Sequence, residues 1–117
     1  MKQYTTPEQT AKLIELGVEK PKGWYVDGVT NNIKLYVNID ENPMMFNYSI
    51  GELISFLPRT IKLYYDLNIL STSQGWRVLY GMIGDGDMWS IEHEVYGNEL
   101  IDVLYNMILK LKEEGVI

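Results

Sequence analysis

The sequence predicts one α+β domain over residues 1–117, in which helices cover one face of an antiparallel sheet. The last segment, 98–117, has apolar residues at helical spacing. Three further segments, 61–70, 76–83 and 88–96, alternate apolar with polar residues as strands do. Clusters of turn residues separate these strands, which favours an antiparallel meander. The strand–helix–strand repeat typical of parallel sheets is absent from the sequence pattern.

The first helix is expected from about Pro7 to Leu16. Thr6 is its expected N-cap, and Gln9 completes a capping box with that threonine. Proline fits the first helical position, where the N–H has no partner within the helix. Gly17 is expected to end the helix in a left-handed conformation.

Residues 23–40 are interpreted as a β-hairpin. Residues 24–26 form a short apolar strand, and residues 33–40 alternate apolar with polar side chains. The turn is expected near residues 30–32, and the sequence leaves the state of residues 44–46 open.

A short second helix is expected from Ser49 to Leu57. Ser49 as N-cap and Glu52 three residues later form a second capping box. Pro58 disfavours a helical conformation at the preceding leucine and so ends the helix.

The remaining strands form the meander. We expect the first of them to be continuous from Ile61 to Leu70, followed by a turn at 71–75 and a return strand at 76–83. A second turn at 84–87 then leads to a third strand at 88–96.

The C-terminal helix has the clearest period in the chain. Its apolar face comprises Leu100, Ile101, Leu104, Met107, Ile108 and Leu111. Asn98 is the expected N-cap and Gly115 the expected stop. Because a helix of this length is marginal alone, it needs a surface to pack on. We expect that surface to be the sheet face carrying Leu63, Tyr65 and Leu67.

Composition excludes several classes of protein. The chain has no cysteine, so disulfides, cysteine-based metal sites and thiol catalysis are excluded. A net charge of −6 with scattered basic residues argues against nucleic-acid binding. No apolar run reaches membrane-spanning length, and the first ten residues lack the apolar core of a signal peptide. We therefore expect a cytoplasmic protein that has no membrane partner and no cofactor.

Candidate metal ligands concentrate in one segment, at Asp85, Asp87, Glu92 and His93. An Asp-x-Asp pair ahead of a glutamate is similar to the start of a calcium loop. Trp89, however, stands where that loop needs another Asp or Asn. Asp-Gly pairs are equally typical of hairpin turns, which is the other interpretation.

His93 is the only histidine in the chain. It could act as a general base, or it could be a partly buried strand residue. In an uninterrupted strand it shares a face with Trp89, Ile91 and Val95, whereas Glu92 points to the opposite face.

Motifs for nucleophilic or phosphate chemistry are missing. None of the serines lies in Gly-x-Ser-x-Gly, and the glycines of 81–86 are not followed by Lys-Ser or Lys-Thr. The sequence therefore does not favour an enzyme.

The second face of the predicted sheet is unusually apolar. Tyr36 and Tyr64 fall on it beside Leu70, Leu79 and Ile83. Either a helix or the segment after the hairpin covers this face, or the face binds another protein or a second copy of the chain. Tyr36, Tyr64 and Leu79 are the candidate binding residues.

Three segments carry a family resemblance. Residues 48–58 (YSIGELISFLP), 99–115 (ELIDVLYNMILKLKEEG) and 10–17 (TAKLIELG) resemble a family of small uncharacterised proteins from gut bacteria, their phages and other mobile elements. These segments are the predicted helices. The resemblance implies a mobile-element origin and no particular chemistry.

The sequence as a whole favours a small non-enzymatic interaction or regulatory protein of phage or mobile-element origin. It would bind another protein, or itself, through the aromatic-rich sheet face. The alternative is a small metal-dependent or acid/base enzyme that uses the acidic segment 85–94.

Overall fold

A computed structural model describes residues 2–19, 21, 24–26, 33–35, 47–83 and 89–117 of the protein. The elements are α1 Pro7–Glu15, β1 Trp24–Val26, β2 Ile33–Leu35, α2 Ile50–Phe56, β3 Thr60–Ile61, β4 Tyr65–Thr72, β5 Gly75–Ile83, β6 Trp89–Gly97 and α3 Leu100–Glu113. Strands β3-β4-β5-β6 form one antiparallel sheet in that order, and β1 and β2 pair separately as an antiparallel hairpin. The predicted α+β class is confirmed.

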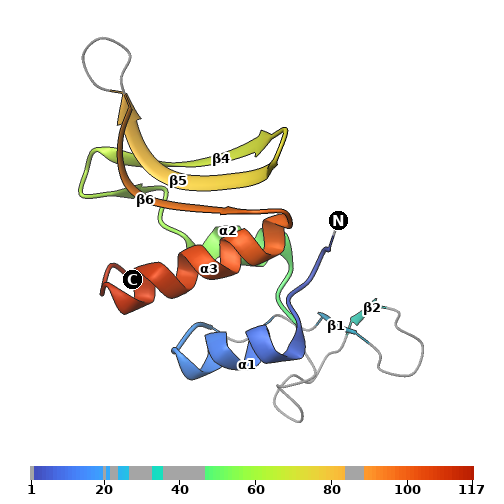
Figure 1. The fold of residues 1–117 in the computed structure, drawn as a ribbon. Coiled ribbons are helices and arrows are strands. Elements are labelled where there is room, and N and C mark those ends of the chain that lie inside the picture. The colour runs from blue at the N-terminus through green and yellow to red at the C-terminus, as the bar shows by residue number, and fades with distance from the viewer. Residues whose placement is uncertain (1, 20, 22–23, 27–32, 36–46, 84–88) are drawn as a thin grey trace.

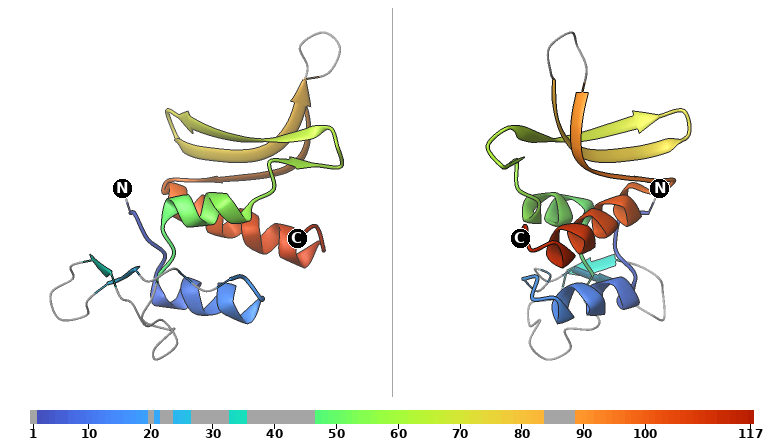
Figure 2. Two further views of the ribbon diagram at one scale, coloured as in Figure 1. Left: turned by 180° about the vertical axis from the view of Figure 1, so that it is seen from behind. Right: turned by 60° about the vertical axis from the view of Figure 1, so that its left-hand side comes forward.

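The helices all lie on one side of the four-stranded sheet. Helices α2 and α3 lie directly against the sheet, and α1 lies on their far side (Figures 1 and 2). The predicted packing of the C-terminal helix on one sheet face is therefore confirmed. The strands face it with Val78 and Tyr80 of β5, which are fully buried, and with Val95 of β6.

Helix α3 supplies most of the core. Its buried residues are Leu100, Ile101, Val103, Leu104, Met107, Ile108 and Leu111. At 100° per residue they cover about 160° of the helix circumference, which is more than one flat neighbour can cover. The helix accordingly packs against the sheet and against α2.

Two of the helices end in the same way. After α1, the N–H of Gly17 bonds to the carbonyl of Ile14 and the N–H of Val18 to that of Leu13. Gly115 and Val116 repeat this pattern after α3. Both glycines have positive φ, of 87° and 72°. These are Schellman stops at the two predicted glycines. The N-cap of α3 is Glu99, so the expectation of Asn98 was wrong by one residue.

The predicted strand from Ile61 to Leu70 is interrupted by a tight turn. Lys62 and Leu63 have φ of 49° and 69°, and the N–H of Tyr64 bonds to the carbonyl of Ile61. Positive φ at two successive positions normally requires Asn or Gly, so the sequence contains no signal for this turn. Leu63 is 86% exposed and does not lie under α3, contrary to expectation. Tyr65 and Leu67, the other two expected contacts, do pack on the core.

A bulge in β6 changes which of its side chains point toward the helices. Tyr80 pairs with His93, but the next residue, Gly81, pairs with Ile91, so β6 has one extra residue at Glu92. The bulge places His93 on the buried face and Ile91 on the opposite one. The expectation that these two residues share a face was therefore wrong.

The first turn of α3 approaches the sheet at a glycine. A Cβ atom on Gly97 would lie 2.7 Å from Cγ2 of Val103, so any larger residue would push the helix away. Gly75, at the start of β5, would place a Cβ 2.5 Å from the carbonyl oxygen of Gly97. The two glycines therefore permit close packing at this corner of the fold.

A buried chain of hydrogen bonds joins the N-terminal segment to α1 and to the residues before α2. The N–H of Tyr48 donates to Oγ1 of Thr5. The two threonine hydroxyls, Thr5 and Thr10, lie 2.7 Å apart, and that of Thr10 donates to Oδ1 of Asn47 over 2.6 Å. If Thr5 donates to Thr10, each hydroxyl both donates and accepts. Both buried hydroxyls are then fully paired, which buried positions require.

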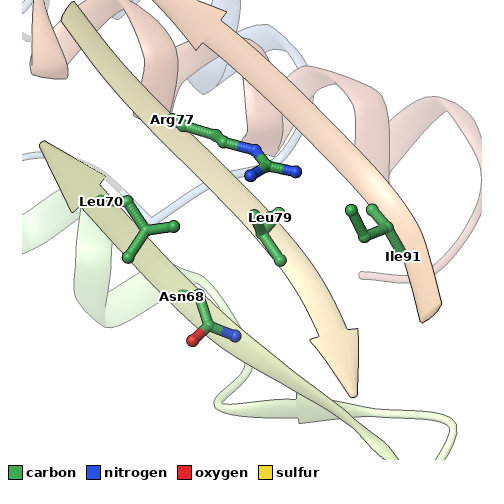
Figure 3. A pocket seen from close by; sticks show the side chains of 5 residues that line it. All are labelled: Asn68, Leu70, Arg77, Leu79 and Ile91. Atoms are coloured by element: carbon green, nitrogen blue, oxygen red, sulfur yellow. The ribbon is translucent and has the colours of Figure 1, made fainter. Parts of the chain in front are cut away.

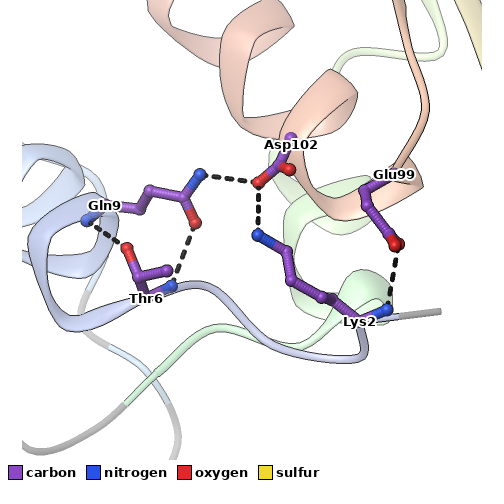
Figure 4. A network of polar contacts seen from close by, with 5 residues as sticks. All are labelled: Lys2, Thr6, Gln9, Glu99 and Asp102. Atoms are coloured by element: carbon purple, nitrogen blue, oxygen red, sulfur yellow. Dashed lines mark hydrogen bonds and ion pairs between the residues drawn. The ribbon is translucent and has the colours of Figure 1, made fainter.

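A second polar cluster ties the N-terminus to the start of α3 (Figure 4). Asp102 accepts hydrogen bonds from Nε2 of Gln9, at 2.8 Å, and from Nζ of Lys2, at 3.0 Å. Burial raises the pKa of Asp102, but these hydrogen bonds outweigh burial and leave the pKa below its ordinary value. Gln9 also completes the predicted capping box with Thr6.

We predict that Thr10→Val destabilises the fold by about 1–3 kcal/mol, because it leaves Asn47 Oδ1 without its donor. Valine matches threonine in shape, so packing should be unchanged. Urea denaturation measures the free energy of unfolding. Thr10→Ser keeps the hydroxyl and is the control. Equal losses for the two variants would contradict the hydrogen-bond account.

We predict that Asp102 stabilises the fold at neutral pH and not in acid. Its lowered pKa means that the contribution is present above the unfolded-state value near 3.8 and is lost as pH falls through the folded-state value. Asp102→Asn should therefore be less stable than the wild type at pH 7, with the difference disappearing at about pH 2. Glu113→Gln, an exposed change on the same helix, is the control. A difference that persists in acid would argue against the charge.

Candidate protein-binding surface

The sheet face opposite the helices carries no helix in the part of the chain that the structure describes (Figures 1 and 2). We call it the open face. Its residues on β4, β5 and β6 include Asn68, Leu70, Arg77, Leu79, Ile91, Glu94 and Tyr96.

A small hollow lies at the centre of the open face (Figure 3). Its volume is about 130 Å³, and aliphatic side chains form most of its surface. Leu79 forms the floor and is only 2% exposed, whereas Leu70 and Ile91 on the flanking strands are 41% and 40% exposed. Pockets for drug-sized ligands measure about 300–1,000 Å³, so this hollow suits a single aliphatic side chain.

Charged and aromatic groups border the hollow. Nε of Arg77 donates to Oε2 of Glu94 at 3.0 Å, and the guanidinium lies 5.5 Å from the centre of the Tyr96 ring. Hydrogen bonding from Tyr96 is the main cause that lowers the pKa of Glu94; burial opposes it, and Arg77 adds to the lowering. Glu94 is therefore ionised at neutral pH and holds Arg77 in place.

A wider and shallower hollow of about 500 Å³ adjoins the first at the end of the β4–β5 hairpin. Trp76, Arg77 and Tyr96 line it together with polar residues such as Gln74 and Asn98. Tryptophan, tyrosine and arginine are the residues most enriched where proteins bind one another. The two hollows share Arg77 and so adjoin, although Trp76 itself packs against the core on the helix side of the sheet.

The predicted binding residues fall in three different places. Leu79 lies on the open face, as expected, where it is the floor of the hollow. Tyr64 lies in the turn between β3 and β4 and not in a strand, contrary to expectation, and it is 67% exposed. Tyr36 lies outside the described residues. Of the two tyrosines expected on this face, the structure therefore tests only Tyr64, which does not lie on it.

The predicted metal and general-base residues are only partly described. Asp85 and Asp87 lie outside the described residues. Glu92 pairs with Lys62 across the sheet, and that bond is the main cause that lowers its pKa. His93 is buried, and its Nδ1 lies 2.9 Å from a carboxylate oxygen of Glu114. Among the described residues, neither ring nitrogen has a partner with hydrogen-bond geometry.

Glu92 and His93 thus contact different residues, Lys62 and Glu114. Within the described part of the chain, no three His, Cys, Asp or Glu side chains are grouped to hold a metal ion. Neither of the two hollows described above is lined by His93. A base role would require a substrate to reach this side chain.

Several residues of the open face were not singled out from the sequence. Arg77, Glu94 and Tyr96 become neighbours only through the cross-strand register. The sequence carried one signal for this face: residues 76–83 alternate as a strand does, which places the charged residue at position 77 on the same side as Leu79. Ile91 was assigned to the wrong face because the bulge at Glu92 leaves no mark in the sequence.

Comparison with known protein families, with curated proteins and with solved structures finds no significant match for this chain. Among the helices of the described residues, none combines the length and apolar character needed to cross a bilayer. The function therefore has to be argued from the open face.

Proposed function

We propose that this protein is a small non-enzymatic interaction module that binds another protein chain through its open face. The observation that supports this most strongly is an aliphatic hollow on a sheet face that no described helix covers. Leu70 and Ile91, each about 40% exposed, lie beside buried Leu79 and form a small contiguous apolar patch that an apolar partner group could cover.

The hollow indicates the chemistry of the partner. Its volume accommodates one Leu, Ile or Met side chain, and the aliphatic lining has no donor for a polar substrate apart from Asn68 and Arg77. Arg77 is already paired with Glu94, so an anionic ligand would have to displace that carboxylate. An apolar anchor from a protein segment fits this surface better than a charged metabolite does.

The border of the hollow supports the same partner. Around the apolar centre, the open face presents Arg77 and Tyr96. An apolar centre with aromatic and arginine residues at its margin is the usual anatomy of protein interfaces.

A cytoplasmic location, a regulatory role and an origin in a phage or mobile element belong to the same proposal. The cysteine-free sequence supports the first. The resemblance of the three helical segments supports the origin. The alternative of a metal-dependent enzyme stays a prediction, since Asp85 and Asp87 lie outside the described residues.

We predict that Ile91→Lys abolishes binding of the natural partner without unfolding the protein. The substitution places a charge at the rim of the hollow, where a bound apolar anchor would have to desolvate it. Proteins captured by the wild type are identified, purified and titrated against each variant. We expect a loss of affinity of at least about tenfold, which corresponds to about 1.4 kcal/mol.

Leu63→Lys is the matched control, because Leu63 is equally aliphatic, more exposed and outside the open face. It should bind like the wild type. Thermal melting confirms that both variants are folded. If Ile91→Lys binds as tightly as the wild type, or if both variants lose binding equally, the open face is not the binding surface.

A further inference from the structure

Strand β4 has an edge that is only half covered. Its neighbour β3 is two residues long and pairs with Asp66 and Tyr65 alone. Beyond this point, the N–H of Leu67 donates to the carbonyl of Arg59 at 2.8 Å, which fixes the direction in which that backbone group points. Because strand backbone groups alternate in direction, the N–H and C=O groups of Ile69 and Ser71 point outward on the same side. No described residue bonds to them.

This edge lacks the devices that normally prevent strands from pairing between molecules. Residues 67–76 contain no charged residue and no proline. The opposite edge of the sheet differs, because β6 carries Glu92 and Glu94 and contains the bulge. Charges and bulges are protective features, so the sheet is protected at β6 and unprotected at β4.

We propose that a second copy of this chain occupies the β4 edge, with the two β4 strands antiparallel about a two-fold axis at Leu70. The two four-stranded sheets then join into one continuous sheet of eight strands. This inference goes beyond the proposed function, because it places a second contact, between copies of the chain, at the sheet edge and not on the open face. Pairing of this kind is a common way for a free strand edge to bind protein.

The register of this pairing follows from the backbone directions. Ile69 of one copy lies opposite Ser71 of the other, so their outward N–H and C=O groups form the hydrogen-bonded pairs. The two Leu70 residues then face each other at the non-hydrogen-bonded position, where side chains approach most closely. Each of these leucines is 41% exposed in a single copy, and each would cover the other.

The charges permit the β4 register and oppose the equivalent pairing at β6. In the β4 pair the residues that pair run from Asn68 to Thr72 and none of them is charged, while Asp66 is covered by Thr60 of its own chain. A β6 pair about His93 would instead place Glu92 opposite Glu94, which is destabilising. Since each copy has a net charge of −6, added salt should strengthen the β4 pair by screening the remaining repulsion.

The pairing also extends the binding surface. Leu70 lies on β4 and Ile91 on β6, at opposite sides of the hollow (Figure 3). Joining two sheets at β4 places the two open faces side by side, with the pair of leucines between the two hollows. A partner with two apolar anchors could then be held at both hollows at once, which raises its apparent affinity.

Sedimentation velocity over a concentration series up to about 1 mM tests the inference, since a short edge interface is expected to be weak. We expect the wild type to dimerise, and to dimerise more tightly as salt is raised. Leu70→Lys places two like charges across the axis. Ser71→Pro removes an outward N–H that the β4–β5 ladder does not use. Both variants should remain monomeric and folded.

Ile91→Lys is the matched control, because it introduces the same charge on the same face at equal exposure but two strands away. It should dimerise like the wild type. Hydrogen exchange provides a second readout. The amides of Ile69 and Ser71 should become protected as concentration rises, whereas that of Leu67 should be protected throughout.

A wild type that is monomeric throughout the series overturns the inference. Equal effects of Leu70→Lys and Ile91→Lys on dimerisation also overturn it, because the contact would then involve the face and not the edge. In either case the proposed function is judged separately. A monomeric protein whose partner binding is still abolished by Ile91→Lys keeps its open face as the binding site.

Discussion

The fold depends on covering helix α3. Seven of its side chains are buried, on an arc too wide for one neighbour, so the helix must lie between the sheet and other elements. The sheet supplies Val78 and Tyr80 on one side, and α2 covers another part of the arc. Gly97 allows the first turn of α3 to approach the sheet closely. The local caps and stops then determine where each helix begins and ends.

In this arrangement, helices cover one face of the sheet and the other face has no helix. With three helices on one side, the described chain has none left for the open face. The residues there are not those of an ordinary solvated surface, because Leu70, Leu79 and Ile91 adjoin one another. The Arg77–Glu94 pair fixes polar groups beside this apolar centre. The candidate site is therefore a consequence of the packing of α3 on the opposite face.

Much of the fold could be predicted because its signals are local. Thr6 with Gln9, and Ser49 with Glu52, form capping boxes between residues three apart in the chain, and both are present. Gly17 and Gly115 stop helices because only glycine adopts their conformation readily. The turn at Lys62 and Leu63 escaped prediction because neither residue favours positive φ. Its side chains are exposed, so the β3–β4 pairing and the Lys62–Glu92 ion pair, and not burial, hold the turn against local preference.

The candidate site was predictable only in part. Alternation alone placed Leu79 on the second face, and the structure agrees. The bulge at Glu92 reversed the facing of Ile91, and no sequence pattern marks a bulge without glycine. The buried chain through Thr10 and Asn47 joins residues 37 positions apart, so it depends on the assembled fold. Features that depend on register or on long-range contacts were the ones missed.

The central claim is that one face of the sheet packs against α3 in the core, whereas the other face is the binding surface. A comparison of the stabilities of two variants tests it. The free energy of unfolding is measured for Leu104→Ala, in the buried stripe of α3, and for Ile91→Ala, on the open face. We expect Leu104→Ala to lose about 2–5 kcal/mol, because it leaves a cavity in the core. Ile91→Ala should lose about 1 kcal/mol or less. Equal losses, or a larger loss for Ile91→Ala, would contradict this division of the sheet.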